Sequence, residues 1–175
     1  MANTATSMYF DGTNDYVQFP DNTCDLGNTD FTIELWIKPK AASGNNERIF
    51  CYGTNTGSPY NQVALLFNSS EYLVVRLENS DRITYSTALK VGLWYHVAIV
   101  RASGTVTLYV DGVSRGTYSD SSANYTEDDL MLGYDATLGG DYAFSGYITN
   151  FRQVNGVAVY TGAFTSPTAP LELTQ

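Results

Sequence analysis

The sequence has few basic residues. Nine lysines and arginines stand against eighteen aspartates and glutamates, which gives a net charge of -9. An acidic chain of this kind repels phosphate backbones and anionic membrane surfaces. We therefore expect no nucleic-acid partner and no membrane insertion, and we consider divalent cations and neutral ligands instead.

Long apolar runs and a recognisable leader are also missing. No segment approaches the roughly 20 consecutive apolar residues of a membrane-spanning helix, and the opening MANTATSMYF lacks the basic and apolar regions of a signal peptide. We expect a protein that acts outside the cell or as part of a virus particle. It would reach that place either after removal of a signal or by release on lysis.

Cysteine and histidine are scarce. The two cysteines, Cys24 and Cys51, are too few for a disulfide framework, and one disulfide or two free thiols fit the sequence equally well. The single histidine, His96, is not part of any histidine or cysteine cluster, so the sequence shows no zinc-binding pattern. We expect His96 to be a structural residue that is hydrogen-bonded to backbone.

Glycine and aromatic residues are abundant. Fifteen glycines, 14 tyrosines and eight phenylalanines, with 15% charged residues, are typical of many short strands joined by tight turns. A chain of 175 residues is long enough for one all-β domain with a sizeable core. We expect residues 1–175 to form a single domain with no helix of normal length.

The clearest local pattern is a hairpin in residues 93–112, LWYHVAIVRASGTVTLYVDG. We predict a three-residue loop at 102–104, which places Arg101 opposite Thr105. Since side chains alternate between the two faces of a strand, one face collects the residues that we expect to form the core. These are Trp94, His96, Ala98, Val100, Val106, Leu108 and Val110.

A second turn follows at Asp111-Gly112, two residues that favour left-handed backbone. A strict two-residue turn there would point Arg115 into the core, so we expect a bulge or a short edge strand between residues 113 and 119. Earlier in the chain, FTIELWIKP at 31–39 alternates apolar and polar residues and reads as a half-buried strand. Trp36 falls on its polar face, and we expect another layer to cover it.

Five segments of the sequence occur in the same order as similar segments of one known family. They are FDGTNDYV (10–17), FTIELWIKP (31–39), WYHVAIVR (94–101), LYVDG (108–112) and FSGYITNFRQVNGVAVYTGAF (144–164). Together they resemble the concanavalin A-like lectin and glucanase superfamily, and more narrowly its laminin G-like jelly-roll modules. The ending, NGVAVYTGAFTSPTAPL (155–171), is similar in style to versions found in phage and viral particle proteins. The resemblance implies an all-β, antiparallel two-sheet jelly-roll sandwich of about 12–14 strands.

Catalytic patterns are missing from this sequence. Glycoside hydrolases of this scaffold place two carboxyl groups at alternate positions of one strand, so that both point into one cleft. Glu34 has no such neighbour, and the acidic cluster at 127–129 is consecutive and lies in a predicted loop. No phosphate-binding loop or nucleophile elbow is present either. We therefore expect no enzyme activity.

The resemblance also implies a calcium site at the rim of the sandwich. Asp11 and Asp15 occupy matching positions in the first loop. A late motif that is often G-x-I-D-[DE]-[VF]-R in relatives is here GYITNFR (146–152), in which Asn150 could still offer an amide oxygen. The predicted metal ligands are Asp11, Asp15 and Asn150. The alternative is that Asp11 and Asp15 only cap turns.

A sugar site needs aromatic faces for the apolar side of the ring and fixed polar partners for its hydroxyls. We predict this site in the glycine-rich loop at 135–142, where backbone can approach a ligand closely. The candidate contacts are Tyr134, Asp135, Asp141 and Tyr142, with Tyr125 in the acidic loop at 119–129. The predicted function is carbohydrate binding, with a cell-surface glycan as partner. The alternative is a structural or assembly domain of a virion or adhesin, with a second copy or another virion protein as partner.

Overall fold

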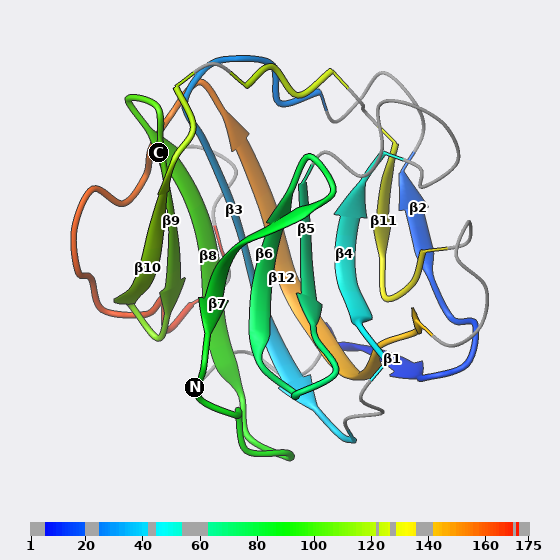
Figure 1. Ribbon diagram of the computed structural model, residues 1–175. Coiled ribbons are helices and arrows are strands. Elements are labelled where there is room, and N and C mark those ends of the chain that lie inside the picture. The colour runs from blue at the N-terminus through cyan, green and yellow to red at the C-terminus, as the bar shows by residue number, and fades with distance from the viewer. Residues whose placement is uncertain are drawn as a thin grey trace.

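The computed structural model describes residues 6–19, 25–41, 45–53, 63–121, 123–126, 129–135, 142–169 and 171. Within these residues, twelve strands form two antiparallel six-stranded sheets that face each other, and there is no α-helix (Figure 1). The predicted all-β sandwich is therefore confirmed. No helix in this part of the chain is long and apolar enough to cross a membrane.

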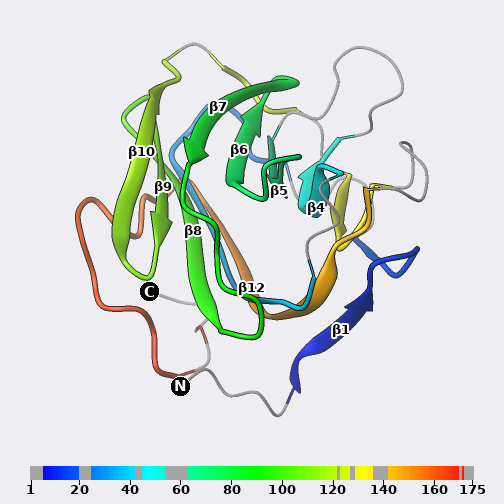
Figure 2. The ribbon, with the colours of Figure 1, turned by 60° about the horizontal axis from the view of Figure 1, so that its bottom comes forward.

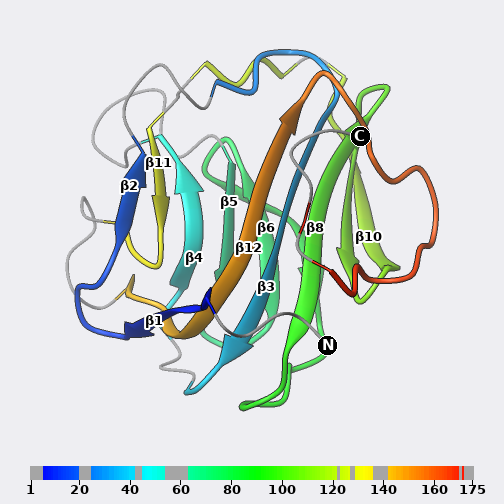
Figure 3. The same ribbon diagram turned by 180° about the vertical axis from the view of Figure 1, so that it is seen from behind.

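The two sheets take strands from both halves of the chain. Sheet A consists, in spatial order, of β1 (Met8–Asp11), β12 (Ser145–Asn155), β3 (Phe31–Pro39), β8 (Tyr95–Ala102), β9 (Thr105–Val110) and β10 (Val113–Ser119). Sheet B consists of β2 (Val17–Phe19), β11 (Leu130–Leu132), β4 (Glu47–Tyr52), β5 (Val63–Phe67), β6 (Leu73–Leu77) and β7 (Ser80–Tyr85). Figure 3 shows sheet A from its outer side, with β12, β3 and β8 next to one another.

The main core lies between the sheets, and β3 shows how the sequence pattern builds it. Phe31, Ile33, Leu35 and Ile37 alternate along the strand and belong to the large apolar cluster. The intervening Thr32, Glu34 and Trp36 are also buried, although they point the other way. Trp36 is thus covered, as predicted. A strand that is buried on both faces requires another layer over the outside of sheet A.

The central hairpin differs from the prediction by one residue. Its loop has two residues, Ser103 and Gly104, both left-handed with φ of 47° and 75°, as the favoured hairpin turns require. Ala102 therefore pairs with Thr105, and Val97 pairs with Val110. This register turns Val97, Ile99, Val106, Leu108 and Val110 toward the core and His96, Ala98 and Val100 outward.

His96 is buried as predicted, with 0% of its surface exposed, but it lies on the outer face of sheet A instead of in the core between the sheets. Trp94, which was predicted to be a core residue, is only half-buried. Both corrections follow from the same error in loop length.

The second turn has the predicted geometry. Asp111 and Gly112 are left-handed, and the pairing of β10 with β9 shifts between Ser114 and Gly116, which is the expected bulge. The bulged Arg115 lies with its guanidinium 4.8 Å from the centre of the Tyr85 ring, in β7 of sheet B. The two sheets therefore meet at this edge, where Figure 2 shows β7 beside β10.

After β12 the chain crosses the outer face of sheet A. We call residues 156–169 the strap (Figure 3, orange to red). Near its start, the Thr32 hydroxyl donates to the Val157 carbonyl at 3.0 Å and accepts from the Val159 N–H at 2.9 Å. Further along, the Phe164 N–H donates to the Gly112 carbonyl at 3.0 Å. The strap is therefore fixed at β3 and at the turn between β9 and β10, and it supplies the missing layer.

Replacing Gly112 by alanine tests the second anchor. Gly112 has a φ of 75°, and a Cβ there would lie 1.8 Å from the Phe164 carbonyl oxygen, whereas Gly156, with a φ of 78°, has no atom within 4 Å of that position. Gly156→Ala should therefore cost only the left-handed backbone strain, about 1–2 kcal/mol. Gly112→Ala should cost a further 1–3 kcal/mol, roughly, for overpacking. Urea denaturation measures both, and equal losses would contradict this anchor.

Candidate functional site

A buried charged network lies under the strap. The Glu34 carboxylate, 0% exposed, accepts hydrogen bonds from His96 Nε2 at 2.9 Å, from Arg152 Nε at 2.8 Å and from the Tyr160 hydroxyl at 2.9 Å. A second guanidinium nitrogen of Arg152 also bonds it. The donors come from β8, β12 and the strap, so this one carboxylate on β3 joins three other segments. Its oxygens are saturated and the strap covers them.

The surroundings keep Glu34 ionised. Burial acts to raise the pKa of its carboxyl, but the hydrogen bonds from His96, Arg152 and Tyr160 outweigh burial and leave the pKa below its ordinary value. His96 Nδ1 is buried and has no partner among the described residues. A neutral ring that carries its proton on Nε2 leaves no N–H without an acceptor, so the geometry favours this tautomer. The predicted backbone partner of His96 is thus replaced by a carboxylate.

The outer face of sheet A is open where the strap does not reach. Four residues from neighbouring segments form a row there. Tyr9 pairs with Tyr147, and Tyr147 pairs with Lys38. The pairing of Ile37 with Tyr95 places Trp94, just before β8, beside Lys38. Because these residues are cross-strand neighbours, their side chains share one face.

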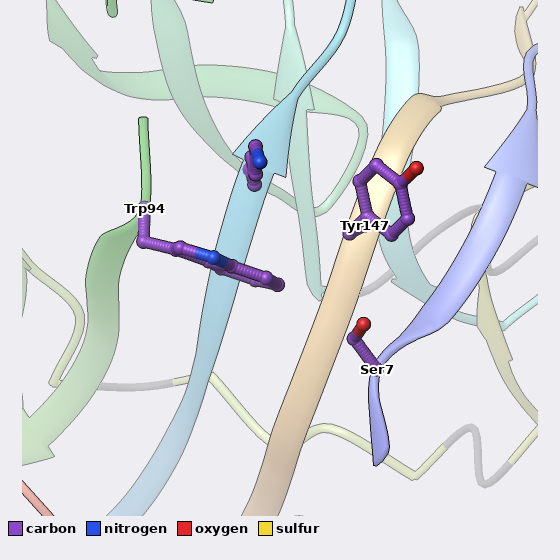
Figure 4. Close-up of a pocket in the computed structure, with 4 residues that line it drawn as sticks. Ser7, Trp94 and Tyr147 are labelled. Carbon is purple, nitrogen blue, oxygen red and sulfur yellow. The ribbon is translucent and has the colours of Figure 1, made fainter. Parts of the chain in front are cut away.

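Two adjoining pockets of about 290 Å³ each flank Lys38 and Tyr147. The first, the Trp94 pocket, is lined by Ser7, Lys38, Trp94 and Tyr147. Figure 4 shows the Trp94 indole reaching across β3 toward Tyr147 on β12, with Ser7 at the same opening. The second, the Lys40 pocket, is lined by Lys38, Pro39, Lys40, Val91, Gly92 and Tyr147.

Aromatic rings and ammonium groups alternate around these pockets. The ring of Tyr147 lies 5.0 Å from that of Tyr9 and 6.4 Å from that of Trp94, measured between centroids. Lys38 Nζ lies 5.6 Å from the centre of the Tyr147 ring, and Lys40 Nζ lies 4.9 Å from that of Tyr9. Lys40 also donates a hydrogen bond to the Tyr9 hydroxyl at 2.7 Å. The site thus offers flat apolar surfaces beside fixed polar groups.

The residues predicted to bind a ligand lie elsewhere, and most are buried. Tyr125 is 1% exposed, packs edge-on against Phe31 and donates its hydroxyl to Asp120, so it is committed to the core and is not a loop contact. Tyr134 is 9% exposed and Asp135 is 0% exposed. Tyr142 is half-buried near Arg48, whose guanidinium carbon lies 5.9 Å from the ring centre, and Asp141 is outside the described residues.

The predicted metal ligands do not come together. The Asp15 carboxylate accepts the Asp11 N–H at 3.0 Å, and the Asp11 carboxylate accepts the Thr13 N–H at 2.7 Å, so both cap the first turn. Asp11 pairs with Ser145, which is five residues, roughly 17 Å of strand, from Asn150. The described residues contain no group of three histidine, cysteine or acidic side chains suited to a metal. The described structure therefore does not bring the three predicted ligands together, and calcium binding at Asp11, Asp15 and Asn150 stays a prediction.

Sequence reasoning missed the pocket residues for a physical reason. A three-residue hairpin loop predicts that Trp94 lies in the core with His96, and Tyr9 and Tyr147 lie more than a hundred residues apart in the chain. The one local signal was the alternation in β3, where Lys38 shares the polar face with Glu34 and Trp36. Of the cysteines, Cys51 is a buried free thiol and Cys24 lies outside the described residues.

Comparisons with known proteins agree with this architecture. A family model described as the concanavalin A-like lectin/glucanases superfamily matches residues 11–168. A putative carbohydrate binding protein from Bacteroides ovatus is 19% identical with a TM-score of 0.64, over 91% of this chain and 44% of that one. Domains LG4-5 of the mouse laminin alpha1 chain are 18% identical with a TM-score of 0.63, over 84% of this chain and 40% of that one.

A third similar structure comes from a bacterial enzyme. Domain 4 of AbnA, a GH43 extracellular arabinanase from Geobacillus stearothermophilus, was solved in complex with arabinotriose. It is 18% identical with a TM-score of 0.64, over 93% of this chain and 74% of that one. At such identities the likeness establishes the fold, and this chain spans less than half the length of the Bacteroides and laminin chains.

Replacing Glu34 by glutamine tests the network. At neutral pH the variant should lose about 3–5 kcal/mol of unfolding free energy, because Arg152 stays buried without its counter-charge. A carboxyl whose pKa is lowered by folding stabilises the protein above its ordinary pKa of 4.5, and this contribution disappears as the pH falls through the lower folded value. The gap between parent and variant should therefore shrink steadily on acidification below 4.5.

Denaturant unfolding across this pH range measures the difference in unfolding free energy between the parent and the Glu34→Gln variant. Glu71→Gln, a change of the same kind at an exposed position, is the control and should show little difference at any pH. A gap for Glu34→Gln that does not depend on pH would contradict an ionised Glu34.

Proposed function

The chain belongs to the concanavalin A-like lectin/glucanase superfamily, and from this premise we propose that it is a non-enzymatic carbohydrate-binding module whose site is the pair of pockets around Tyr147. The observation that carries the proposal is the cross-strand row of Tyr9, Tyr147, Lys38 and Trp94 on a part of the outer face of sheet A that the strap leaves open.

The chemistry of the row suits a sugar. The C–H face of a pyranose or furanose packs against a flat aromatic ring, while its hydroxyls need donors and acceptors at fixed places. The rings of Trp94 and Tyr147 supply such surfaces on both sides of the Trp94 pocket. The Ser7 hydroxyl and the Lys38 ammonium group border the same space and supply polar partners. Lys38 and Tyr147 stand on strands, and Ser7 and Trp94 immediately precede β1 and β8, so little ordering is needed on binding.

The same pockets lack the groups that glycoside hydrolysis requires. That reaction uses a pair of carboxyl groups on either side of the scissile bond. None of the described residues that line the two pockets is acidic. Glu34, on the same face of β3, is enclosed by its own hydrogen bonds and by Tyr160. Binding without turnover is the function that this set of residues supports.

The similar structures support the same function. Two of the three proteins described above carry carbohydrate binding or a bound oligosaccharide in their descriptions. Carried over to this chain, those descriptions suggest a glycan on the surface of a cell or in its surroundings as the partner. Attachment to such a glycan is the setting in which the module would act, and a structural or assembly role in a virus particle or adhesin is the alternative.

Single replacements of Trp94 and Tyr147 by alanine test the site. A glycan array should first identify a bound oligosaccharide, and titration calorimetry should then show at least tenfold weaker binding for each variant, equivalent to about 1.4 kcal/mol. The melting temperature should change little, because both side chains are partly exposed. Tyr16→Ala, which removes an exposed tyrosine from outside both pockets, is the matched control and should bind like the parent.

Tyr142→Ala serves as the comparison with the loop site predicted from sequence. If this variant loses binding while the Trp94 and Tyr147 variants do not, the site lies at the loop and the proposed location is wrong. If no glycan binds and the Trp94 variant changes the mass measured by light scattering, the face is an assembly surface. That outcome would replace carbohydrate binding by the structural role.

A further inference from the structure

The lysines of this chain are not scattered. The sequence contains three, Lys38, Lys40 and Lys90. Lys38 and Lys40 line the pockets, and Lys90 immediately precedes Val91 and Gly92, which line the Lys40 pocket. In a chain whose net charge is -9, two of the three lysines line these pockets and the third adjoins them in sequence.

The arginines, by contrast, are occupied elsewhere. Arg48, Arg101 and Arg152 are buried, and each lies within 4.0 Å of a carboxylate. Arg76 pairs with Asp81, whereas Arg82 and Arg115 lie over tyrosine rings. Arg82 and Arg115 thus form no ion pair among the described residues either, and what distinguishes Lys38 and Lys40 is that they line one pocket together.

Among the described residues, no carboxylate pairs with either pocket lysine, Lys38 or Lys40. Their ammonium groups instead lie over the rings of Tyr147 and Tyr9, which hold them in place without cancelling their charge. The hydrogen bond with the Tyr9 hydroxyl raises the pKa of Lys40, so this group stays protonated. An ammonium group has three donors, and Tyr9 uses one of those of Lys40.

We infer that the ligand is an acidic oligosaccharide whose carboxylate or sulfate group lies in the Lys40 pocket, between Lys38 and Lys40, while a neighbouring sugar ring packs in the Trp94 pocket. The inference rests on the proposed function and adds the chemical class of the ligand. The net charge of the chain predicts a neutral ligand, and this inference reverses that expectation. The attraction of Lys38 and Lys40 for an anion acts at short range, whereas repulsion by distant acidic groups is screened beyond roughly 8–10 Å.

The arrangement explains why two pockets share Lys38 and Tyr147. An anion that carries no sugar would need only the two lysines, and a neutral sugar would need only the aromatic rings of the protein. Because the two pockets share Lys38 and Tyr147, two adjacent sugars of one oligosaccharide can contact the charged surface and the aromatic surface at once. Lys38 lies between the two pockets. Since Asp11 is the carboxylate whose charge acts on Lys40, it sets the background that an acidic ligand must overcome.

Matched pairs of glycans test the inference. An array of uronic-acid oligosaccharides beside their methyl esters, and of sulfated oligosaccharides beside the unsulfated ones, changes the charge and keeps the ring. We expect the acidic member of a pair to bind at least tenfold more tightly at low salt, with a ratio that falls as sodium chloride is added. Preference within the ester pairs identifies a carboxylate as the group that is bound, and preference within the sulfate pairs identifies a sulfate.

Variants then locate the charge. Lys38→Met and Lys40→Met remove the charge and keep the apolar stem of the side chain. Each should reduce the ratio of the affinities for the acidic and the neutral glycan toward one, while the neutral glycan still binds. Arg82→Met, the same loss of charge in the β7 strand of sheet B, should leave the ratio unchanged. If acidic and neutral members bind equally and Trp94→Ala weakens both, the charge assignment is wrong and carbohydrate binding stands. If no member of any pair binds, both proposals fail.

Discussion

The carboxylate of Glu34 is the group on which the outer half of the molecule depends. An ionised carboxylate removed from water is destabilising unless donors surround it, and here the donors come from β8, β12 and the strap. The hydrogen bond from Tyr160 to Glu34 holds the strap on sheet A. The rings of Tyr160 and Phe164 stack there beside His96, with 3.6 Å between the centroids of the two rings. The layer that results covers one part of the face and leaves the rest of it open, which is where the two pockets lie.

The proposed site lies on a sheet instead of on loops, and this position has a physical consequence. Lys38 and Tyr147 belong to paired strands whose backbones are fixed by ladder hydrogen bonds, so their side chains start from defined positions. Loop sites gain adaptability but must be ordered when a ligand arrives. The neighbouring segment that holds Val91 and Leu93 is the exception, because both side chains are about half exposed and lie next to the sheet-borne residues. Rigid and adjustable surfaces therefore meet at the Lys40 pocket.

Local patterns predicted the strands well and their pairing less well. The alternation in residues 31–39, the turn at Asp111-Gly112 and the bulge after it depend on neighbours in sequence, and all were predictable. The hairpin loop was misjudged by one residue, and because strand side chains alternate, that single error exchanged the two faces of β8. The row of Tyr9, Tyr147, Lys38 and Trp94 could not be predicted, since it exists only once β1, β12, β3 and β8 are adjacent. Burial of Tyr125 and Asp135 likewise depends on packing between segments distant in sequence.

The place of the strap in the chain has a consequence for biosynthesis. It follows all twelve strands, so Glu34 and His96 leave the ribosome long before Tyr160 and Phe164 do. Until then the face that they occupy is open to water, and the nascent protein carries a solvated carboxylate where the finished one carries a desolvated one. The strap therefore joins sheet A after the strands that it covers, and a chain cut before residue 160 leaves the Glu34 carboxylate without the Tyr160 donor.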